Sequence, residues 1–266
     1  MNRPKLFDSH CHIHEAAYPG AEAAYRRALR AGVERLICVG TDEITSAEAL
    51  SFTAGRRGCL ASVGLHPHEA AKGQPALRRI RRLAEGPPAK LAAIGECGLD
   101  YFYSHSPVDA QLAALRFQME LALELRLPLI FHVRQAFDDF WPVFDDYAKT
   151  VPAVRGVLHS FTDNLANLDK VLERGLFIGV NGIATFSRNS SQQAVWRHLP
   201  LDSVLLETDA PFLTPVPLRG KVNEPAFIGL VADRLAELKQ ITPGEIIQAA
   251  TKNAKSLFLN PKNQNL

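Results

Sequence analysis

The sequence lacks most features of membrane, secreted and disulfide-stabilised proteins. No apolar run in its 266 residues approaches the roughly 18 that a transmembrane helix needs, and the opening MNRPKLFDSHCH contains no apolar signal-peptide segment. Only four cysteines occur, widely spaced and without a C-x-x-C pair, so neither a disulfide framework nor a structural zinc site is indicated. We therefore expect a cytoplasmic protein with reduced, mostly buried cysteines and no membrane contact.

An excess of charge of one sign is also missing. Thirty basic and 28 acidic side chains leave a formal net charge of +2, too little for the broad basic surface of a protein that coats nucleic acid. Any nucleic-acid contact is therefore expected to be local. With 47% hydrophobic and 22% charged residues, the chain can bury a sizeable core. Nothing in the sequence specifies an oligomer, and a monomer is the expectation.

Short apolar runs rich in β-forming residues recur along the whole chain. Most are nearly continuous, as expected for parallel strands buried on both faces, whereas half-solvated antiparallel strands would alternate. Segments with helical spacing separate these runs, and this alternation predicts a single-domain (β/α)8 TIM barrel over residues 1–266. An open, doubly wound sheet is the alternative, although no G-x-G-x-x-G motif follows the first run. The predicted strands are Lys5–His12, Arg35–Thr41, Leu60–His66, Leu91–Cys97, Pro128–Val133, Gly156–Phe161, Leu176–Asn181 and Ser203–Thr208.

Three segments outside the predicted strands carry clear helix patterns. Pro107–Arg126 has apolar residues at helical spacing, with Ser106 as the expected N-cap and Pro107 at the first helical position. Thr242–Glu245 reads as a capping box that opens the last helix. Arg78–Arg82 is the sharpest run of positive charge, and its apolar stripe favours the solvated face of an outer helix over a DNA-tracking patch.

Histidine, aspartate and glutamate gather at the C-terminal ends of the predicted strands. In a barrel these ends surround one mouth, where the active sites of this fold are built. Four imidazoles and two carboxylates would be costly to bury there without a metal to coordinate. This set exceeds what one catalytic zinc ion uses, so two divalent ions that activate water for hydrolysis are predicted. The predicted ligands are His10, His12, Glu96, His132, His159 and Asp209.

Spacing also indicates individual roles within this set. Side chains at i and i+2 of a strand share a side, so His10 and His12 can reach one cation. Glu96 is the expected bridge between two ions, and Asp209 either takes a proton from the attacking water or serves only as a ligand. Glu207 lies deeper and is expected to orient a ligating histidine. Zinc, manganese, nickel and magnesium all suit such a donor set.

Substrate contacts are expected around the same mouth. Arg134 is placed to hold a phosphate, the alternative being a structural ion pair with Asp100 or Glu207. Arg219 and Lys221 follow the last strand, where barrels often bind phosphate, unless their loop is merely solvated. Tyr101 begins an aromatic run that either stacks a base or packs a loop. His66 and His68 are candidates for contact with phosphate or the leaving group, and His66 is the better one. Alternatively, the intervening Pro67 makes a rigid turn that holds both as donors behind the ligands.

Several motifs occur in a fixed order from Phe7 to about Leu259. They are Asp8–His12, Gly64–His68, Gly95–Tyr101, His132–Arg134, His159–Thr162, Glu207–Pro211, Arg219–Pro225 and Asn253–Ala254. Together they resemble the TatD-like metal-dependent deoxyribonucleases within the metal-dependent hydrolase barrels. The resemblance implies a (β/α)8 barrel with a one- or two-metal site on the same six predicted ligands. It also implies magnesium-dependent hydrolysis of DNA phosphodiesters, often exonucleolytic from the 3′ end.

Two positions depart from that family's pattern. Asp163 stands where the family usually has Gly, and His14 stands where an Asp commonly follows the first histidine pair. Asp163 adds negative charge near the mouth or caps the following helix. These departures bear on substrate preference, because the ligand positions themselves are intact.

Three functions are compatible with these patterns. The first is a metal-dependent phosphodiesterase that acts on short or single-stranded DNA ends. The alternative is a metal-dependent hydrolase of a small ester or amide, or of an aminoacyl-tRNA ester, because a fold and a metal pair do not specify the substrate. The third is a binding protein without catalysis, which the intact ligand set disfavours.

Overall fold

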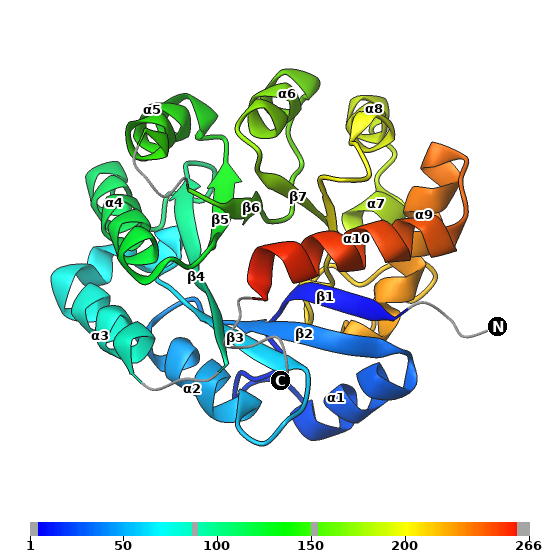
Figure 1. Cartoon of the computed structure of the whole chain (residues 1–266), viewed down its shortest axis with the longest axis horizontal. Helices are drawn as coiled ribbons and strands as arrows, with labels where there is room; N and C mark the ends of the chain where they lie inside the picture. Colours follow the sequence, from blue (N-terminus) through cyan, green and yellow to red (C-terminus); the bar gives the residue numbers. More distant parts are fainter. Residues whose placement is uncertain (1–4, 87–89, 150–153, 260–266) are drawn as a thin grey trace. The chain divides into compact units, whose positions relative to one another are not determined.

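A computed structural model describes residues 5–86, 90–149 and 154–259 of the chain. Its strands form one eight-stranded sheet in the order β1-β2-β3-β4-β5-β6-β7-β8, with helices between consecutive strands (Figure 1). All eight predicted strands are present. They are β1 (Leu6–Cys11), β2 (Val33–Val39), β3 (Cys59–Val63), β4 (Leu91–Asp100), β5 (Leu129–Arg134), β6 (Gly156–Leu158), β7 (Phe177–Val180) and β8 (Val204–Leu206).

Neighbouring strands pair in parallel, as the continuous apolar runs predicted. Parallel registers join β3 to β4, β4 to β5, β5 to β6, and β7 to β8. The first strand also meets the last: Cys11 forms a parallel bridge with Ala210, and the N–H of His12 donates to the carbonyl oxygen of Ala210 over 2.6 Å. This strand order confirms the predicted (β/α)8 barrel over an open, doubly wound sheet.

Helices alternate with the strands along the chain, and in the described residues none is long and apolar enough to cross a membrane. The helices are α1 (Ala21–Arg30), α2 (Glu43–Thr53), η1 (Pro67–Lys72), α3 (Gly73–Glu85), α4 (Val108–Leu125), α5 (Phe137–Ala148), α6 (Leu165–Glu173), α7 (Ile183–Phe186), α8 (Ser190–His198), η2 (Pro225–Phe227), α9 (Ile228–Lys239) and α10 (Pro243–Phe258).

The chain divides into two compact units. The first unit comprises Met1–Ile37, Arg57–Cys59 and Ser160–Ser256, and the second comprises Cys38–Arg56, Leu60–His159 and Leu257–Leu266. The organisation of residues 1–266 as a single domain therefore stays a prediction.

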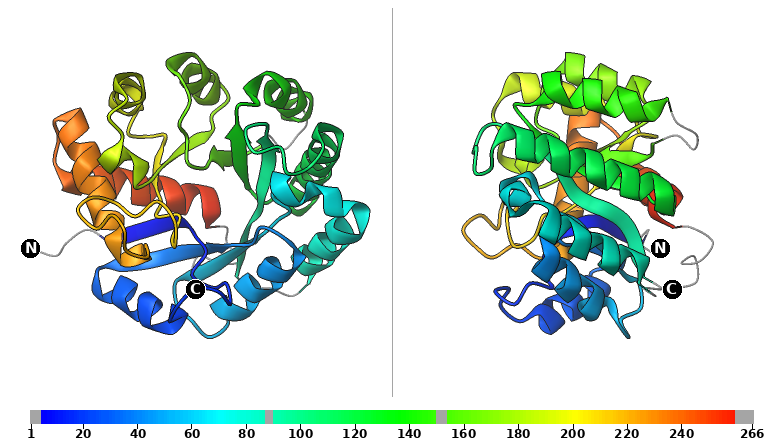
Figure 2. Two further views of the ribbon diagram at one scale, coloured as in Figure 1. Left: turned by 180° about the vertical axis from the view of Figure 1, so that it is seen from behind. Right: turned by 90° about the vertical axis from the view of Figure 1, so that its left-hand side faces the viewer.

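The first unit holds β1 and β8 with the C-terminal helices. α10 lies beside β1 in Figures 1 and 2, and the hydroxyl of Thr251 donates to the backbone oxygen of Lys5 over 2.9 Å. The predicted capping box is confirmed, since Glu245 accepts from the N–H of Thr242 and the Thr242 hydroxyl accepts from the N–H of Glu245. Four apolar residues of α10 are buried, which anchors the helix by one face: Ile246, Ala250, Ala254 and Leu257.

The second unit packs aromatic side chains of α5 against β5. Phe131 of β5 lies 5.1 Å from Phe140 and 6.0 Å from Phe144, between ring centroids. In α3, Ile80 is buried whereas Arg79 and Arg82 are exposed, which confirms that the Arg78–Arg82 run lies on an outer helix.

The four cysteines, which are distributed over both units, are buried, as predicted.

One predicted helix start is wrong. α4 begins at Val108, and Pro107 is its N-cap because its ψ of 146° lies outside the helical region. Ser106 acts elsewhere: its hydroxyl donates to the backbone oxygen of His68 over 2.7 Å and accepts from the N–H of Ala71. Ser106 therefore ties this loop to η1 and does not cap α4.

Candidate active site

A cluster of histidines surrounds one carboxylate in the second unit. Oε1 of Glu96 lies 2.9 Å from Nδ1 of His132, 3.5 Å from Nε2 of His66 and 3.9 Å from Nε2 of His159. We call these four residues the Glu96 cluster. Donor atoms of His66, Glu96 and His132 all lie within 4.8 Å of one another, a spacing that one divalent cation can span.

Glycines let β4 approach β5 closely enough to build this cluster. Gly98 pairs with His132 in the β4–β5 register and has a φ of 151°. A Cβ atom at Gly98 would collide with the carbonyl oxygen of His132, and one at Gly95, where φ is 130°, would collide with that of Ile130. The register also shifts between Ile94 and Cys97. The glycines on either side of Glu96 are thus a condition of its placement.

Asp100 supports the cluster from the end of β4. Its Oδ2 lies 2.8 Å from Nε2 of His132 and 3.0 Å from Nε2 of His68. Burial alone would raise the pKa of Asp100, but hydrogen bonds from His132, His68 and the N–H of Tyr103 outweigh it and hold that pKa well below its usual range. Asp100 therefore stays ionised and orients His132, as carboxylates beside metal-binding histidines commonly do.

The histidines of the cluster differ in protonation. Burial, together with the neighbouring His132, lowers the pKa of His66 to about 4, so its imidazole is neutral near pH 7. Neutral imidazole is the form that binds metals. Burial would also lower the pKa of His132, but its contacts with Asp100 and Glu96 raise it overall. A carboxylate beside a neutral imidazole is a donor pair that fits a divalent cation.

A second group of donors lies in the first unit. Nε2 of His10, in β1, is 3.1 Å from Nε2 of His12, which follows the strand. Oδ1 of Asp209, beyond β8, lies 3.3 Å from Nε2 of His12 and 3.7 Å from Nε2 of His10. We call these three residues the Asp209 cluster. The structure thus brings the two histidines together, as the i, i+2 spacing predicted.

Backbone contacts position the Asp209 cluster. Oδ1 of Asp8 accepts from the N–H of Thr208 over 2.9 Å and from the N–H of His10 over 3.3 Å. Oδ2 of Asp8 accepts from the Thr208 hydroxyl over 2.5 Å. The N–H of Asp209 donates to the carbonyl oxygen of His10. Because burial outweighs these bonds, the pKa of Asp8 is raised to about 7.

Glu207 is buried among polar groups of the first unit. Its Oε1 accepts from the N–H of Ser160 over 2.7 Å and from Nδ2 of Asn181 over 3.1 Å. Nδ2 of Asn181 also lies 2.8 Å from the Ser160 hydroxyl. The expectation that Glu207 orients a ligating histidine stays a prediction.

Two of the predicted substrate residues belong to the loop after β4 and to β5. The Tyr101 hydroxyl donates to Asp139 over 2.8 Å, whereas the adjacent Phe102 and Tyr103 are each 49% exposed. The Arg134 guanidinium lies against the rings of Phe102 and Tyr103, at 4.1 Å and 4.7 Å from their centroids. Substrate contact by Arg134 and Tyr101 stays a prediction.

The other predicted phosphate contacts lie in the loop after β8. Arg219 donates to the backbone oxygen of Thr214 over 2.8 Å, and its guanidinium lies 4.0 Å from the centroid of Phe186. Lys221 is exposed, and its carbonyl oxygen accepts from the Thr214 hydroxyl. The loop is therefore held by its own hydrogen bonds, and its contact with phosphate stays a prediction.

Two residues of the second unit, His66 and Asp100, lie in places that differ from the expected ones, whereas His68 takes the expected alternative of a supporting donor. His66, expected at the substrate, lies among the metal-ligand candidates of the Glu96 cluster, and Asp100 and His68 join it. A longer β4 could have revealed Asp100, because positions 96, 98 and 100 of a strand face the same side. Nothing in the spacing of His66 and His68, which follow β3, distinguishes a ligand from a substrate contact.

Comparisons with known proteins find relatives along nearly the whole chain. Residues 7–259 match the family described as "TatD related DNase". The chain is 36% identical to "Uncharacterized metal-dependent hydrolase YabD" of Bacillus subtilis, over 95% of this chain and 98% of that protein. It is also 36% identical to "3'-5' ssDNA/RNA exonuclease TatD" of Erwinia tasmaniensis, over 88% and 91%. The crystal structure of the TatD homologue YjjV from Escherichia coli matches with a TM-score of 0.88 and 33% identity, over 96% and 98%.

Proposed function

Because the chain belongs to the TatD-related DNase family and is a metal-dependent hydrolase, we propose that it cleaves phosphodiester bonds of DNA from the 3′ ends of single strands. The observation that carries the proposal is the Glu96 cluster, in which donor atoms of the Glu96 carboxylate and of the His66 and His132 imidazoles all lie within 4.8 Å of one another. The Erwinia relative named as a 3'-5' ssDNA/RNA exonuclease supports the substrate class.

The cofactor that we propose is a pair of divalent ions, held by the six side chains that were predicted from the strand ends. Imidazole and carboxylate donors suit magnesium, manganese, zinc or nickel. Bound divalent ions would polarise the phosphate and lower the pKa of the attacking water. The bridging role of Glu96 stays a prediction. The proposed ligands are His10, His12, Glu96, His132, His159 and Asp209.

The protein's own side chains supply the remaining steps. The Asp209 carboxylate is 13% exposed and lies beside His12, so it can accept a proton from water at the rim. Asp100 and Glu96 contact the two ring nitrogens of His132 and thereby hold its orientation. Arg134, two residues farther along β5, provides a guanidinium that binds phosphate oxygens.

The test is cleavage of an end-labelled single-stranded oligonucleotide by the wild-type protein and by Glu96→Gln. Each is incubated with EDTA or with magnesium, manganese or zinc. A metal-dependent ladder is expected for the wild type, with the rate in Glu96→Gln lower by about a thousandfold. Glu237→Gln is the matched control, because Glu237 is 67% exposed on α9, and it should cleave normally. Turnover of small esters without any DNA ladder would favour the alternative hydrolase.

A further inference from the structure

The loop after β4 carries an exposed aromatic pair that the proposed chemistry does not use. Phe102 and Tyr103 lie 4.8 Å apart between ring centroids, at 90° to each other, and each is 49% exposed. The Arg134 guanidinium lies 4.1 Å from the Phe102 centroid. We call these three residues the aromatic platform, and all of them belong to the second unit.

The platform is held in a defined orientation. The N–H groups of Phe102 and Tyr103 both donate to Oδ1 of Asp100, over 3.0 Å and 2.9 Å. The N–H of Tyr101 donates to the carbonyl oxygen of Arg134 over 3.0 Å. The Tyr103 ring is further supported by His105, which stacks on it at 5.8 Å. A ring fixed in this way loses little conformational entropy when a ligand packs on it.

The same contacts place the platform beside the Glu96 cluster. Asp100, which anchors the aromatic turn through Oδ1, contacts His132 through Oδ2. Arg134 follows His132 by two residues in β5 and pairs with Asp100 in the register. The platform is therefore tied to a candidate metal ligand through one carboxylate and one strand.

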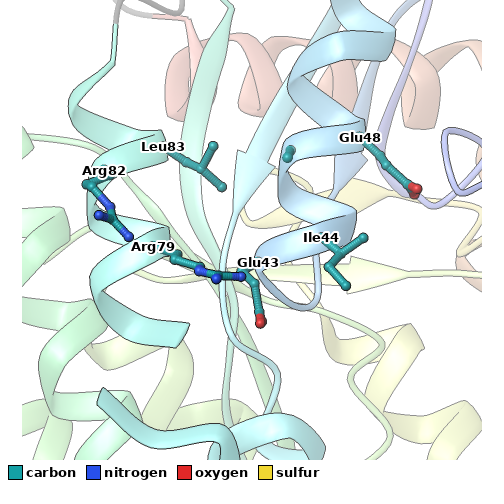
Figure 3. Close-up of a pocket in the computed structure, with 7 residues that line it drawn as sticks. Glu43, Ile44, Glu48, Arg79, Arg82 and Leu83 are labelled. Atoms are coloured by element: carbon teal, nitrogen blue, oxygen red, sulfur yellow. The ribbon is translucent and has the colours of Figure 1, made fainter. Parts of the chain in front are cut away.

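The chemistry of the platform fits a nucleobase. Phe102 is 49% exposed although Arg134 lies over its ring, and every base has a π-face that stacks on such an aromatic ring. The nearby guanidinium attracts the phosphate that accompanies the base. By contrast, the hollow between α2 and α3 in Figure 3 combines Ile44 and Leu83 with side chains of both charges and offers no ring.

We propose that Phe102 stacks a nucleobase of a single-stranded nucleic acid, while Tyr103 and Arg134 hold its ring in position. The proposal rests on the proposed nuclease function and adds a binding contact for the base to it. Within the aromatic run that begins at Tyr101, it assigns the stacking to Phe102, since the Tyr101 hydroxyl is engaged by Asp139.

Binding without cleavage tests the stacking contact directly. Fluorescence anisotropy in EDTA would compare labelled oligothymidylate of about ten nucleotides with an abasic oligonucleotide of equal length and charge. The wild type should bind the base-bearing strand about tenfold more tightly, and Phe102→Ala should lose that preference. Phe102→Trp should retain it. Ile44→Ala, which removes another exposed apolar side chain (60% exposed), should retain it as well.

The outcomes separate the two proposals. Equal binding of both strands by the wild type, or an undiminished preference in Phe102→Ala, would overturn the stacking contact. With metal added, Phe102→Ala should raise the KM for oligothymidylate about tenfold and leave kcat unchanged. If base-dependent binding requires Phe102 but no metal supports cleavage, the stacking contact stands and the nuclease proposal fails.

Discussion

The Glu96 cluster and the Asp209 cluster use the same donor types but are held in different ways. In the Glu96 cluster a side chain positions side chains, since Asp100 contacts both His132 and His68. In the Asp209 cluster a side chain positions the backbone, since Asp8 accepts from the N–H groups of Thr208 and His10. The first arrangement orients individual rings, and the second aligns the strand ends from which the donors project.

The pKa values of the two supporting aspartates are shifted in opposite directions. Hydrogen bonds from histidines outweigh burial at Asp100 and lower its pKa, whereas burial outweighs hydrogen bonds at Asp8 and raises its pKa to about 7. The residue type is identical, so the environment decides the direction. Variants that disturb one cluster at a time can therefore separate the contribution of Asp100, which holds side chains, from that of Asp8, which holds the backbone.

The largest effect is expected for Asp209→Asn, which should lose most of its activity. Removing this carboxylate should lower DNA cleavage by about a thousandfold and the number of bound metal ions by about one. Metal content would be measured by mass spectrometry after dialysis, beside a cleavage assay. Asp233→Asn, on the exposed side of α9, is the matched control. Loss of all bound metal in Asp209→Asn would show that the two clusters do not bind ions independently.

The next effect concerns the backbone that carries the Glu96 cluster. Gly98→Ala should lower the free energy of unfolding by about 3 kcal/mol, because its Cβ would collide with the His132 carbonyl and φ is 151°. Thermal unfolding should show the midpoint lower by about 6–12 °C. Gly229→Ala on α9 has open space around its Cβ and should be neutral or stabilising. Similar midpoints for the two variants would contradict this account of the β4–β5 approach.

Much of this architecture could be predicted because it depends on repeating patterns. Continuous apolar runs marked each of the eight strands, since parallel strands are buried on both faces. Polar side chains at the ends of those runs then indicated His10, His12 and Asp209, which the structure brings together within the first unit. Both inferences need only local sequence and the rule that parallel strands end on the same side.

Other features depended on contacts that local sequence does not encode. β4 was predicted to end at Cys97, because a glycine follows at position 98 and glycine weakens a strand. The strand continues to Asp100, since Gly98 allows it to lie close to β5. Asp100 was consequently missed as a support. The exposed face of the aromatic run could not be predicted either, since the contact of Tyr101 with Asp139 joins residues 38 positions apart.

A smaller loss of stability is expected from removing the Thr208 hydroxyl, which supports the Asp209 cluster through Asp8. Thr208→Val removes a buried hydroxyl that donates to Asp8 and should cost about 2 kcal/mol of unfolding free energy. Urea denaturation measures this difference. Thr251→Val provides the control, because its exposed hydroxyl makes one hydrogen bond to the backbone of Lys5 and should cost less than about 1 kcal/mol. Equal losses would show that the Asp8 contact contributes no more than a surface bond.

The smallest loss of stability is expected from removing helix N-caps, one in each unit. Asp42, the N-cap of α2 in the second unit, accepts from the N–H of Thr45 and pairs with Lys72 at 2.7 Å. Asn164 caps α6 in the first unit without a charge. Either residue changed to Ala should cost about 1 kcal/mol at pH 7.

Only the Asp42 effect should depend on pH. Burial alone would raise the pKa of Asp42, but hydrogen bonds from Lys72 and Thr45 outweigh it and lower the pKa. Its stabilisation is therefore complete above the unfolded pKa of about 3.9 and is lost as the pH falls through the lower folded value. In urea denaturation at a series of pH values, the gap between wild type and Asp42→Ala should narrow below about pH 4, while the Asn164→Ala gap stays constant. Parallel pH profiles would mean that the charge of Asp42 adds nothing to its N-cap.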